Sequence, residues 1–186
     1  HNGAGKTTLS KLIMRLYDVK DGEILYNGRN IKEYSLSSYR KKFCSVFQDY
    51  KIFAMTVAEN VLVKETDGEN ILIAEKALEM GGVADKINSL EKKAHTLLTR
   101  EFDNSGVLLS GGQAQKVSIS KLFANDDFEV AVLDEPSSAL DPVAESKMYD
   151  SIMEGTKNKT VIYISHRLSS ATRSDNILVF EKGEIV

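Results

Sequence analysis

Several short segments of the chain are largely apolar and predict strands. The segments Val130–Leu133 and Val161–Ile164 are continuously apolar, which is typical of strands buried on both faces, as in a parallel sheet. Phe43–Phe47 and Ile177–Phe180 predict two more strands, and Lys182–Val186 predicts the start of another. We therefore expect a sheet whose strands come from distant parts of the sequence.

Apolar residues at helical spacing lie between these strands and predict helices. The positions that share a helix face are Leu9, Leu12, Ile13 and Leu16; Ile71, Ala74 and Leu78; Ile119, Leu122 and Phe123; and Ala144, Met148 and Ile152. The second of these helices should stop at Gly81-Gly82, and a shorter helix should follow at Val83–Leu90. Gly22–Ile31 reads as a β-hairpin around an Asn27-Gly28 turn. Strands that alternate with helices predict an α/β fold with a parallel sheet.

The composition is that of a globular chain and excludes several classes of protein. Of 186 residues, 42% are hydrophobic and 27% are charged, a balance that a disordered chain does not have. The net charge of -3 leaves no basic footprint for a nucleic acid. No apolar stretch reaches the ~18 residues that span a bilayer, and no signal peptide is present. The single cysteine, Cys44, cannot form an internal disulfide and is expected to be a buried structural thiol in a reducing compartment.

The chain opens on a phosphate-binding sequence, Asn2-Gly3-Ala4-Gly5-Lys6-Thr7-Thr8. It is the later part of the P-loop, or Walker A, pattern Gly-x-x-x-x-Gly-Lys-Ser/Thr. Backbone N–H groups around Gly3 and Gly5 can wrap phosphates, and Lys6 can reach the β- and γ-phosphates. The hydroxyl of Thr7 can bind Mg²⁺. Because the first glycine of the pattern and the strand before it are absent, we expect the sequence to be a fragment truncated at its start and at its end.

A second phosphate-binding feature is Leu109-Ser110-Gly111-Gly112-Gln113, which opens a run of helix formers. Its small residues let a ligand approach the main chain, and the start of a helix carries free N–H groups and a partial positive charge. Asp134 and Glu135 provide a third feature, because they end a buried strand, where open α/β sheets bind ligands. Asp134 can hold Mg²⁺ through water, and Glu135 can polarise a water molecule that attacks the γ-phosphate.

In this order, the P-loop, the pentapeptide and the paired carboxylates resemble the nucleotide-binding domain of ATP-binding cassette (ABC) transporters. The signature motif of that family is the pentapeptide at 109–113, and the resemblance covers nearly the whole chain. It implies an α/β P-loop NTPase with a mixed sheet core, a small antiparallel β subdomain and a helical subdomain inserted at about 49–108. The cofactors that it implies are ATP and Mg²⁺, and the activity is that of an ATPase.

The resemblance also implies roles for single residues. Gln48 matches the Q-loop glutamine, which touches Mg²⁺ and the attacking water, and His166 matches the switch histidine at the γ-phosphate. The implied catalytic residues are Glu135, His166 and Lys6. The implied metal ligands are Thr7, Gln48 and Asp134. The implied ATP-binding residues are His1, Asn2, Gly3, Ala4, Gly5, Lys6, Thr7, Thr8, Gln48, Ser110, Gly111, Gly112 and Gln113. The aromatic residue that stacks on adenine in this family would precede His1.

Two partners follow from the same resemblance. A second nucleotide-binding domain, identical or different, would pack head to tail, with Ser137–Asp141 as the D-loop that crosses to it. The helical insertion would dock on the coupling helices of a transmembrane domain, and Phe53–Leu62 looks like the exporter pattern. The implied location is the cytoplasmic face of the cell membrane, as part of a transporter that exports a substrate. No nucleic-acid partner is expected.

Two other classes share the signature motif. A soluble tandem cassette ATPase that acts on the ribosome stays as the alternative, although Ser165-His166-Arg167-Leu168 and Phe53–Leu62 look like exporters. The chromosome-maintenance class inserts a long coiled coil between the P-loop and the signature motif. No heptad run lies between Lys6 and Ser110, which excludes that class.

Overall fold

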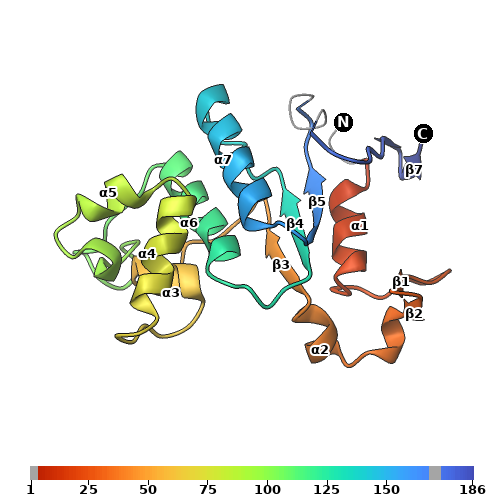
Figure 1. Ribbon diagram of the computed structural model, residues 1–186, viewed down its shortest axis with the longest axis horizontal. Coiled ribbons are helices and arrows are strands. Elements are labelled where there is room, and N and C mark those ends of the chain that lie inside the picture. Colours follow the sequence, from red (N-terminus) through yellow and green to blue (C-terminus); the bar gives the residue numbers. More distant parts are fainter. Residues whose placement is uncertain (1–3, 168–172) are drawn as a thin grey trace. The chain divides into compact units, whose positions relative to one another are not determined.

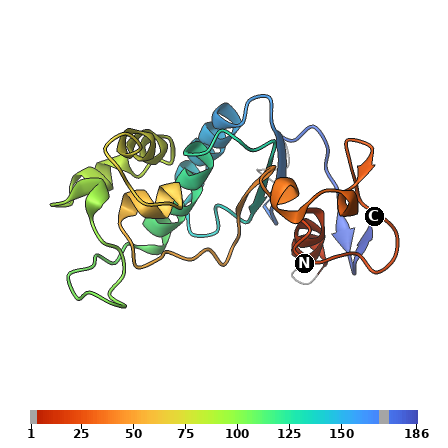
Figure 2. The same ribbon diagram turned by 90° about the horizontal axis from the view of Figure 1, so that it is seen from below.

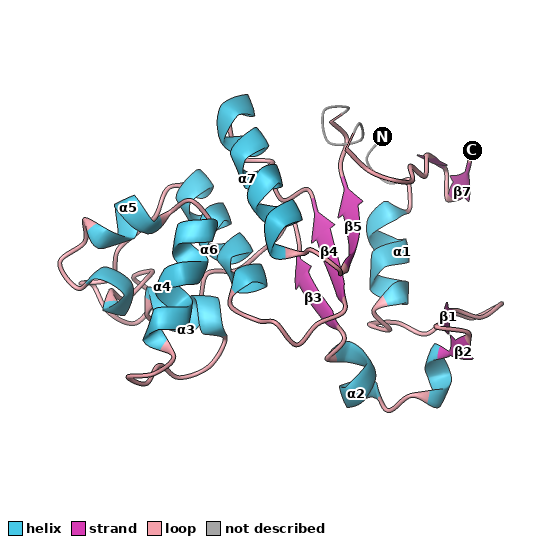
Figure 3. Cartoon of the chain, viewed as in Figure 1, coloured by secondary structure: helices cyan, strands magenta, loops and turns pink. Residues whose placement is uncertain are grey.

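A computed structural model describes residues 4–167 and 173–186 of the chain. The chain divides into two compact units, which are described separately. Unit 1 comprises His1–Ser45, Asp127–Glu135 and Lys159–Val186, and unit 2 comprises Val46–Asp126 and Pro136–Asn158. Figure 3 shows that the strands gather in unit 1, whereas unit 2 is mainly helical. The limits of 49 and 108 for the helical insertion stay a prediction.

The centre of unit 1 is a three-stranded sheet in the order β3-β4-β5 (Figure 1). The strands are β3 (Phe43–Val46), β4 (Val130–Asp134) and β5 (Thr160–Ile164). β4 and β5 are parallel, and their register runs from Val130 opposite Thr160 to Asp134 opposite Ile164. All five residues of β4 are buried, as the continuous apolar run predicts. The α/β class with a parallel sheet is confirmed.

The second apolar strand is less buried than the sequence predicts. In β5 (Thr160–Ile164), Ile164 is buried but Val161, Ile162 and Tyr163 are only half-buried. The reason is its place in the sheet, because β5 is the last strand in the order and has only β4 beside it among the described residues. Cys44 in β3 is likewise half-buried, so the expectation of a buried thiol is wrong.

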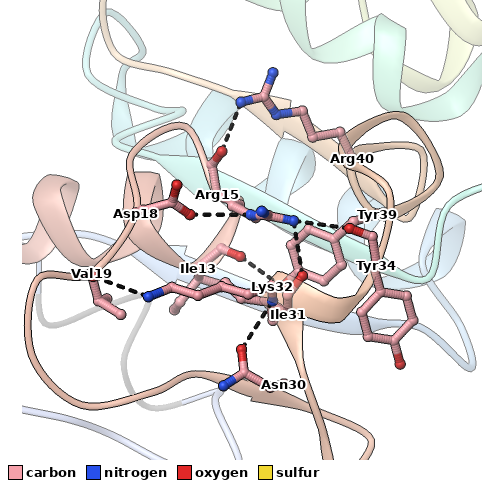
Figure 4. A network of polar contacts seen from close by, with 10 residues as sticks. All are labelled: Ile13, Arg15, Asp18, Val19, Asn30, Ile31, Lys32, Tyr34, Tyr39 and Arg40. Atoms are coloured by element: carbon pink, nitrogen blue, oxygen red, sulfur yellow. Dashed lines mark hydrogen bonds and ion pairs between the residues drawn. The ribbon is translucent and has the colours of Figure 1, made fainter.

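The P-loop helix of unit 1, α1 (Lys6–Ile13), ends one turn earlier than the apolar spacing predicts. Leu16, predicted on its buried face, lies beyond the helix and is exposed. Arg15 explains the end of the helix, because it adopts a left-handed backbone with φ 53°. The Arg15 guanidinium donates to the carbonyl oxygens of Ile31 and Tyr34 at 3.0 Å each, as Figure 4 shows. Arg15 thereby ties the end of α1 to the segment that follows the hairpin.

The predicted hairpin is present in unit 1 as β1 (Leu25–Tyr26) and β2 (Arg29–Asn30), which pair antiparallel. Asn27 and Gly28 have φ values of 51° and 78°, as a type I′ turn requires. The short helices η1 (Ile31–Glu33) and α2 (Leu36–Arg40) follow. This small antiparallel sheet was expected from the sequence and is confirmed.

The last strands of unit 1 differ from the prediction in their extent. β6 (Phe180–Glu181) and β7 (Glu184–Ile185) form an antiparallel hairpin, so Ile177–Val179 precedes the strand instead of belonging to it. Those three residues are exposed, and a strand needs a neighbour for its backbone groups. The Val179 carbonyl accepts from the Val186 N–H at 3.0 Å, whereas Ile177 and Leu178 have no strand beside them in the described part of the chain. The hairpin turn contacts the P-loop, since the Gly183 N–H donates to the Ala4 carbonyl at 3.0 Å. Figure 2 shows this hairpin, in blue near the C-terminus, beside α1, in dark red.

Unit 2 is built from α3 (Val57–Leu62), α4 (Ile71–Met80), α5 (Ala84–Asn88), η2 (Lys93–His95), α6 (Gly111–Phe123) and α7 (Pro142–Gly155). Its core contains the fully buried side chains of Val57, Val61, Ala74, Leu78 and Val117 from α3, α4 and α6. Each buried valine or leucine side chain in this core contributes about 1.5–3 kcal/mol. Among the described residues, the helices are too short or too polar to cross a bilayer.

Candidate active site

The P-loop residues stand at the start of α1 in unit 1. Gly5 precedes the helix with φ 101°, a left-handed conformation that residues with a Cβ rarely adopt. Gly5 has no side chain that could cap the helix, so its own residue does not satisfy the backbone N–H groups of the first turn. Ala4 is buried, whereas Thr7 and Thr8 are exposed beside that start. His1, Asn2 and Gly3, which the sequence assigns to the same loop, lie outside the described residues.

Thr7 and Asp134 meet in unit 1. The Thr7 hydroxyl donates to Asp134 Oδ2 at 2.6 Å, and the Asp134 side chain is buried at the carboxyl end of β4. A hydroxyl and a carboxylate are the hard oxygen ligands that Mg²⁺ prefers. The donor set therefore fits the predicted metal site, although among the described residues no group of three or more His, Cys, Asp or Glu side chains gathers as a metal centre.

Glu135 and His166 also meet in unit 1. Glu135 follows β4 and His166 lies just beyond the end of β5, and the two strands are parallel neighbours. Glu135 Oε1 lies 3.0 Å from His166 Nδ1, and the Glu135 N–H donates to the Ile164 carbonyl at 2.9 Å. The parallel register explains the contact, because it brings the carboxyl ends of both strands to one edge of the sheet.

The backbone of Glu135 is strained. Its φ of 49° is left-handed, a conformation that costs energy for a residue with a Cβ and that often occurs at functional sites. The bond from its N–H to Ile164 holds it there. This conformation aims the carboxylate at His166 instead of continuing the strand direction. The side chain is 13% exposed, whereas that of His166 is 58% exposed.

The signature residues stand at the start of α6 in unit 2, and there the structure corrects one expectation. Ser110 is the residue before the helix, and its Oγ accepts a hydrogen bond from the Gln113 N–H at 3.3 Å. Gln113 Oε1 in turn accepts from the Ser110 N–H at 3.0 Å, which makes a capping box. Two of the N–H groups that the sequence predicts to be free are therefore used by the loop itself. These bonds hold the signature loop in one shape.

The D-loop packs beside this helix start in unit 2. A Cβ built on Gly112 would lie 3.3 Å from the Ala139 carbonyl oxygen, so a larger residue would crowd the D-loop backbone. Asp141 is the cap of α7, because its Oδ1 accepts from the N–H groups of Val143 and Ala144 at 3.0 Å each. The bond from Ala144 is the main cause that lowers the pKa of Asp141. The assignment of Ser137–Asp141 to a contact across two domains stays a prediction.

Three side chains in unit 2 make contacts that no pattern in the sequence predicts. Gln115, buried in α6, donates through Nε2 to Ser138 Oγ at 3.1 Å and accepts from the Ala139 N–H at 3.0 Å. The Tyr50 hydroxyl donates to the Gly111 carbonyl at 2.9 Å. Asn60 is buried and bonds the backbone of Phe53. The spacing of apolar residues does not predict such contacts, because each of these side chains bonds backbone groups of another segment. Gln48, the predicted metal and ATP ligand, is exposed in unit 2.

An apolar pocket of about 370 Å³ opens on unit 2. It is lined by Phe53, Met55, Glu59, Asn60, Val63, Lys64 and Glu65. The side chains of Phe53, Met55 and Val63 are about half exposed or more, at 50%, 49% and 70%. Large apolar side chains that share an exposed pocket are typical of a binding surface.

Comparisons with known proteins agree with the geometry. A family model described as ABC transporter matches residues 1–138. The chain is 38% identical over 192 residues to the subtilin transport ATP-binding protein SpaT of Bacillus subtilis, covering 100% of this chain and 30% of that protein. It is 37% identical over 185 residues to the ATP-dependent lipid A-core flippase of Escherichia coli strain K12, covering 100% of this chain and 31% of the flippase.

A solved structure gives the same result for the fold. A bacterial Atm1-family ABC exporter with ATP bound matches 100% of this chain and 32% of its own, with a TM-score of 0.88 and 30% identity. The P-loop NTPase fold is therefore confirmed. The chain spans roughly 30% of the length of these relatives. None of these named relatives supports the ribosomal alternative.

The family match and the site describe one kind of domain. The matched residues run from the P-loop through the signature pentapeptide to Asp134 and Glu135. Four of the residues to which the resemblance gives roles meet in pairs, Thr7 with Asp134 and Glu135 with His166. This chain therefore belongs to the ABC transporter family, of which it carries the ATP-binding motifs.

Proposed function

We propose that this chain binds ATP with Mg²⁺ and hydrolyses it, and that hydrolysis drives an export transporter in the membrane. The observation that carries the proposal is the convergence of Thr7, Asp134, Glu135 and His166 on one edge of the unit 1 sheet. This edge is where α/β sheets bind nucleotides.

In this proposal the phosphates of ATP lie against the start of α1. The main chain of residues 2–8 donates to the phosphate oxygens, and the Lys6 ammonium group offsets the charge of the β- and γ-phosphates. Thr7 and Asp134 would hold Mg²⁺, which would offset charge on the phosphates. The role of Gln48 as a further ligand stays a prediction. The rest of the catalysis consists of positioning the reacting groups, because the protein forms no covalent bond during phosphoryl transfer of this kind.

Glu135 is the general base in this proposal. Its carboxylate accepts a proton from a water molecule, whose oxygen forms a bond to the γ-phosphorus. The bond from that phosphorus to the bridging oxygen breaks, and ADP leaves with the electron pair. His166 donates to the γ-phosphate and, through its 3.0 Å contact, orients Glu135. The strained backbone of Glu135 supports a functional role, since a strained residue lowers the stability of the fold and such residues cluster at functional sites.

The ATP site is shared between two domains in this proposal. Ser110, Gly112 and Gln113 of one domain close over the γ-phosphate that the P-loop of a second domain holds, in a head-to-tail dimer. The capping box between Ser110 and Gln113 supports this, because it holds the loop ready for a ligand. Hydrogen bonds to a charged phosphate contribute about 1.5–3 kcal/mol each, enough for a few of them to decide association.

The partner on the other side is a transmembrane domain. We assign its coupling helix to the apolar pocket around Phe53, Met55 and Val63, whose edge carries Glu59 and Lys64. An apolar pocket with a charged edge suits an amphipathic helix that inserts apolar side chains. We propose that the domain lies on the cytoplasmic face of the cell membrane. The named relatives, a flippase and a transport protein, support the association with a membrane.

A mixing experiment on the full-length protein tests the shared site. One chain carries Lys6→Ala and the other carries Ser110→Arg, and each homodimer should be inactive because both of its sites are damaged. A mixed dimer has one site with both lesions and one with neither. Co-expression with two affinity tags isolates the mixed dimer, and its release of phosphate from ATP should recover in part. Two variants that still dimerise but recover no activity on mixing would contradict the proposal.

A further inference from the structure

Tyr50 joins two functional segments within unit 2. It lies two positions after Gln48, and its backbone N–H donates to the Phe47 carbonyl at 3.2 Å. Its hydroxyl donates to the carbonyl oxygen of Gly111, the first residue of α6, at 2.9 Å. The segment that follows β3 is thereby tied to the signature loop, although 61 positions separate the two residues.

The acceptor of this bond links Tyr50 to a backbone N–H group of the signature loop. The Gly111 carbonyl and the Gly112 N–H belong to one peptide group, so a donor on the oxygen draws electron density away from the nitrogen. Hydrogen bonds in such a chain polarise one another, which makes the N–H the stronger donor. Gly112 is one of the residues that we assign to the γ-phosphate of a second domain.

The same peptide group is also fixed in direction. The Gly111 carbonyl belongs to the α6 ladder, and an oxygen with two lone pairs can accept Tyr50 as well. On its other side a Cβ built on Gly112 would lie 3.3 Å from the Ala139 carbonyl oxygen, so the D-loop backbone runs close to this glycine. The Tyr50 ring is half-buried, which restricts where its hydroxyl can go. The direction of the peptide between Gly111 and Gly112 is therefore fixed by the α6 ladder and by Tyr50.

We propose that Tyr50 is a positioning residue that aims and strengthens the Gly112 N–H as a donor to the γ-phosphate bound by a second domain. This inference rests on the proposed function. A tyrosine hydroxyl is protonated, and hence a donor, at neutral pH, and burial raises the pKa of the Tyr50 hydroxyl further. Each ATP site combines the P-loop of one domain with the signature loop of the other. Tyr50 acts on the ATP site that receives the signature loop of its own domain, and not on the ATP site that contains the P-loop of its own domain.

The mixed dimer distinguishes these two sites. In the pair of Lys6→Ala and Ser110→Arg chains, the intact site takes its signature loop from the Lys6→Ala chain and its P-loop from the Ser110→Arg chain. We expect Tyr50→Phe on the Lys6→Ala chain to lower the recovered phosphate release by roughly three- to tenfold, the size of one lost hydrogen bond. Tyr50→Phe on the Ser110→Arg chain should leave the recovered activity within about twofold.

Controls make each outcome decisive. Tyr17→Phe on the Lys6→Ala chain removes an exposed hydroxyl in unit 1 and should leave the recovered activity unchanged. The melting temperature of every dimer is measured alongside, and Tyr50→Phe should leave it unchanged. An equal loss from both placements, or a larger loss on the Ser110→Arg chain, would overturn the role of Tyr50. If the parent pair recovers nothing, the shared site fails, and the role of Tyr50 fails with it.

Discussion

Thr7 Oγ1 lies 2.6 Å from Asp134 Oδ2, although 127 positions separate these residues in the sequence. One stands in the first turn of α1 and the other at the end of the buried strand β4. The hydrogen bond brings together two oxygen atoms of the kind that hold Mg²⁺. The two residues that we propose as metal ligands therefore lie side by side.

The first prediction concerns this pair. Thr7→Val keeps the shape of the side chain but removes the hydroxyl, so the Mg²⁺ concentration at half-maximal ATPase activity of the full-length protein should rise about tenfold, as for one lost hydrogen bond. A titration of phosphate release against Mg²⁺ measures it. ATP binding in excess chelator should stay unchanged. Thr160→Val, at an exposed position that begins β5, is the matched control. An unchanged Mg²⁺ requirement in Thr7→Val would exclude Thr7 as a ligand.

The second prediction concerns the base. Glu135→Gln keeps the size of the side chain but cannot take a proton from water, so turnover should fall by ~10²–10⁴-fold while ATP affinity is retained. Steady-state phosphate release and equilibrium binding of ATP, both on the full-length protein, separate the two effects. Glu154→Gln, which changes an exposed carboxylate in unit 2, should have little effect on either. Hydrolysis at the native rate in Glu135→Gln would remove Glu135 from this role.

The third prediction concerns Asn60 beneath the apolar pocket. Its Oδ1 accepts from the Phe53 N–H at 2.8 Å, and its Nδ2 donates to the carbonyls of Phe53 and Thr56 at 3.0 Å each. Asn60→Ala leaves the Phe53 N–H without its acceptor, whereas the Phe53 and Thr56 carbonyls keep bonds from the backbone N–H groups of Met55 and Asn60. The free energy of unfolding should therefore fall by about 1–3 kcal/mol. Urea unfolding of the chain measures the change. Asn104→Ala, in an exposed loop, should cost less than about 0.5 kcal/mol. Equal costs for the two variants would contradict this role of Asn60.

The fourth prediction is a pH dependence in unit 1. Burial, and secondly the hydrogen bond to Glu129, raise the pKa of Tyr26 from 10.0 to about 12. A raised pKa means that the folded state keeps its proton where the unfolded chain loses it. This contribution to stability is fully present below pH 10.0 and is lost as the pH rises toward 12.

Urea unfolding at a series of pH values from 9 to 12 tests this prediction, with the free energy of unfolding as the readout. Tyr26→Phe should flatten the decline, because it removes the titrating hydroxyl. Glu129→Gln should flatten it only in part, because burial is the larger cause. If Tyr26→Phe has the same pH profile as the native chain, the hydroxyl has no such role.

Much of the local structure could be predicted from the sequence. The uninterrupted apolar run at Val130–Leu133 indicates a buried strand, because a polar side chain on either face would lose its water. Asn27-Gly28 indicates the hairpin, since both residues tolerate the left-handed backbone that the turn requires. The P-loop and signature residues indicate phosphate chemistry, because the residue types themselves carry it. These features depend on neighbours in the chain, which the sequence contains.

Other features were decided only by the tertiary structure. Val161–Ile164 is as apolar as Val130–Leu133, yet it is half-buried, since its position in the sheet sets its burial. Ile177–Val179 has the composition of a strand, but a strand also needs a neighbour to pair with. The contact of Tyr50 with Gly111 has no pattern in the sequence, because its acceptor is a backbone carbonyl that every residue has. The sequence by itself determined which residues carry chemistry, and the tertiary structure decided which of them meet, because contacts between distant segments depend on the packing of the whole chain.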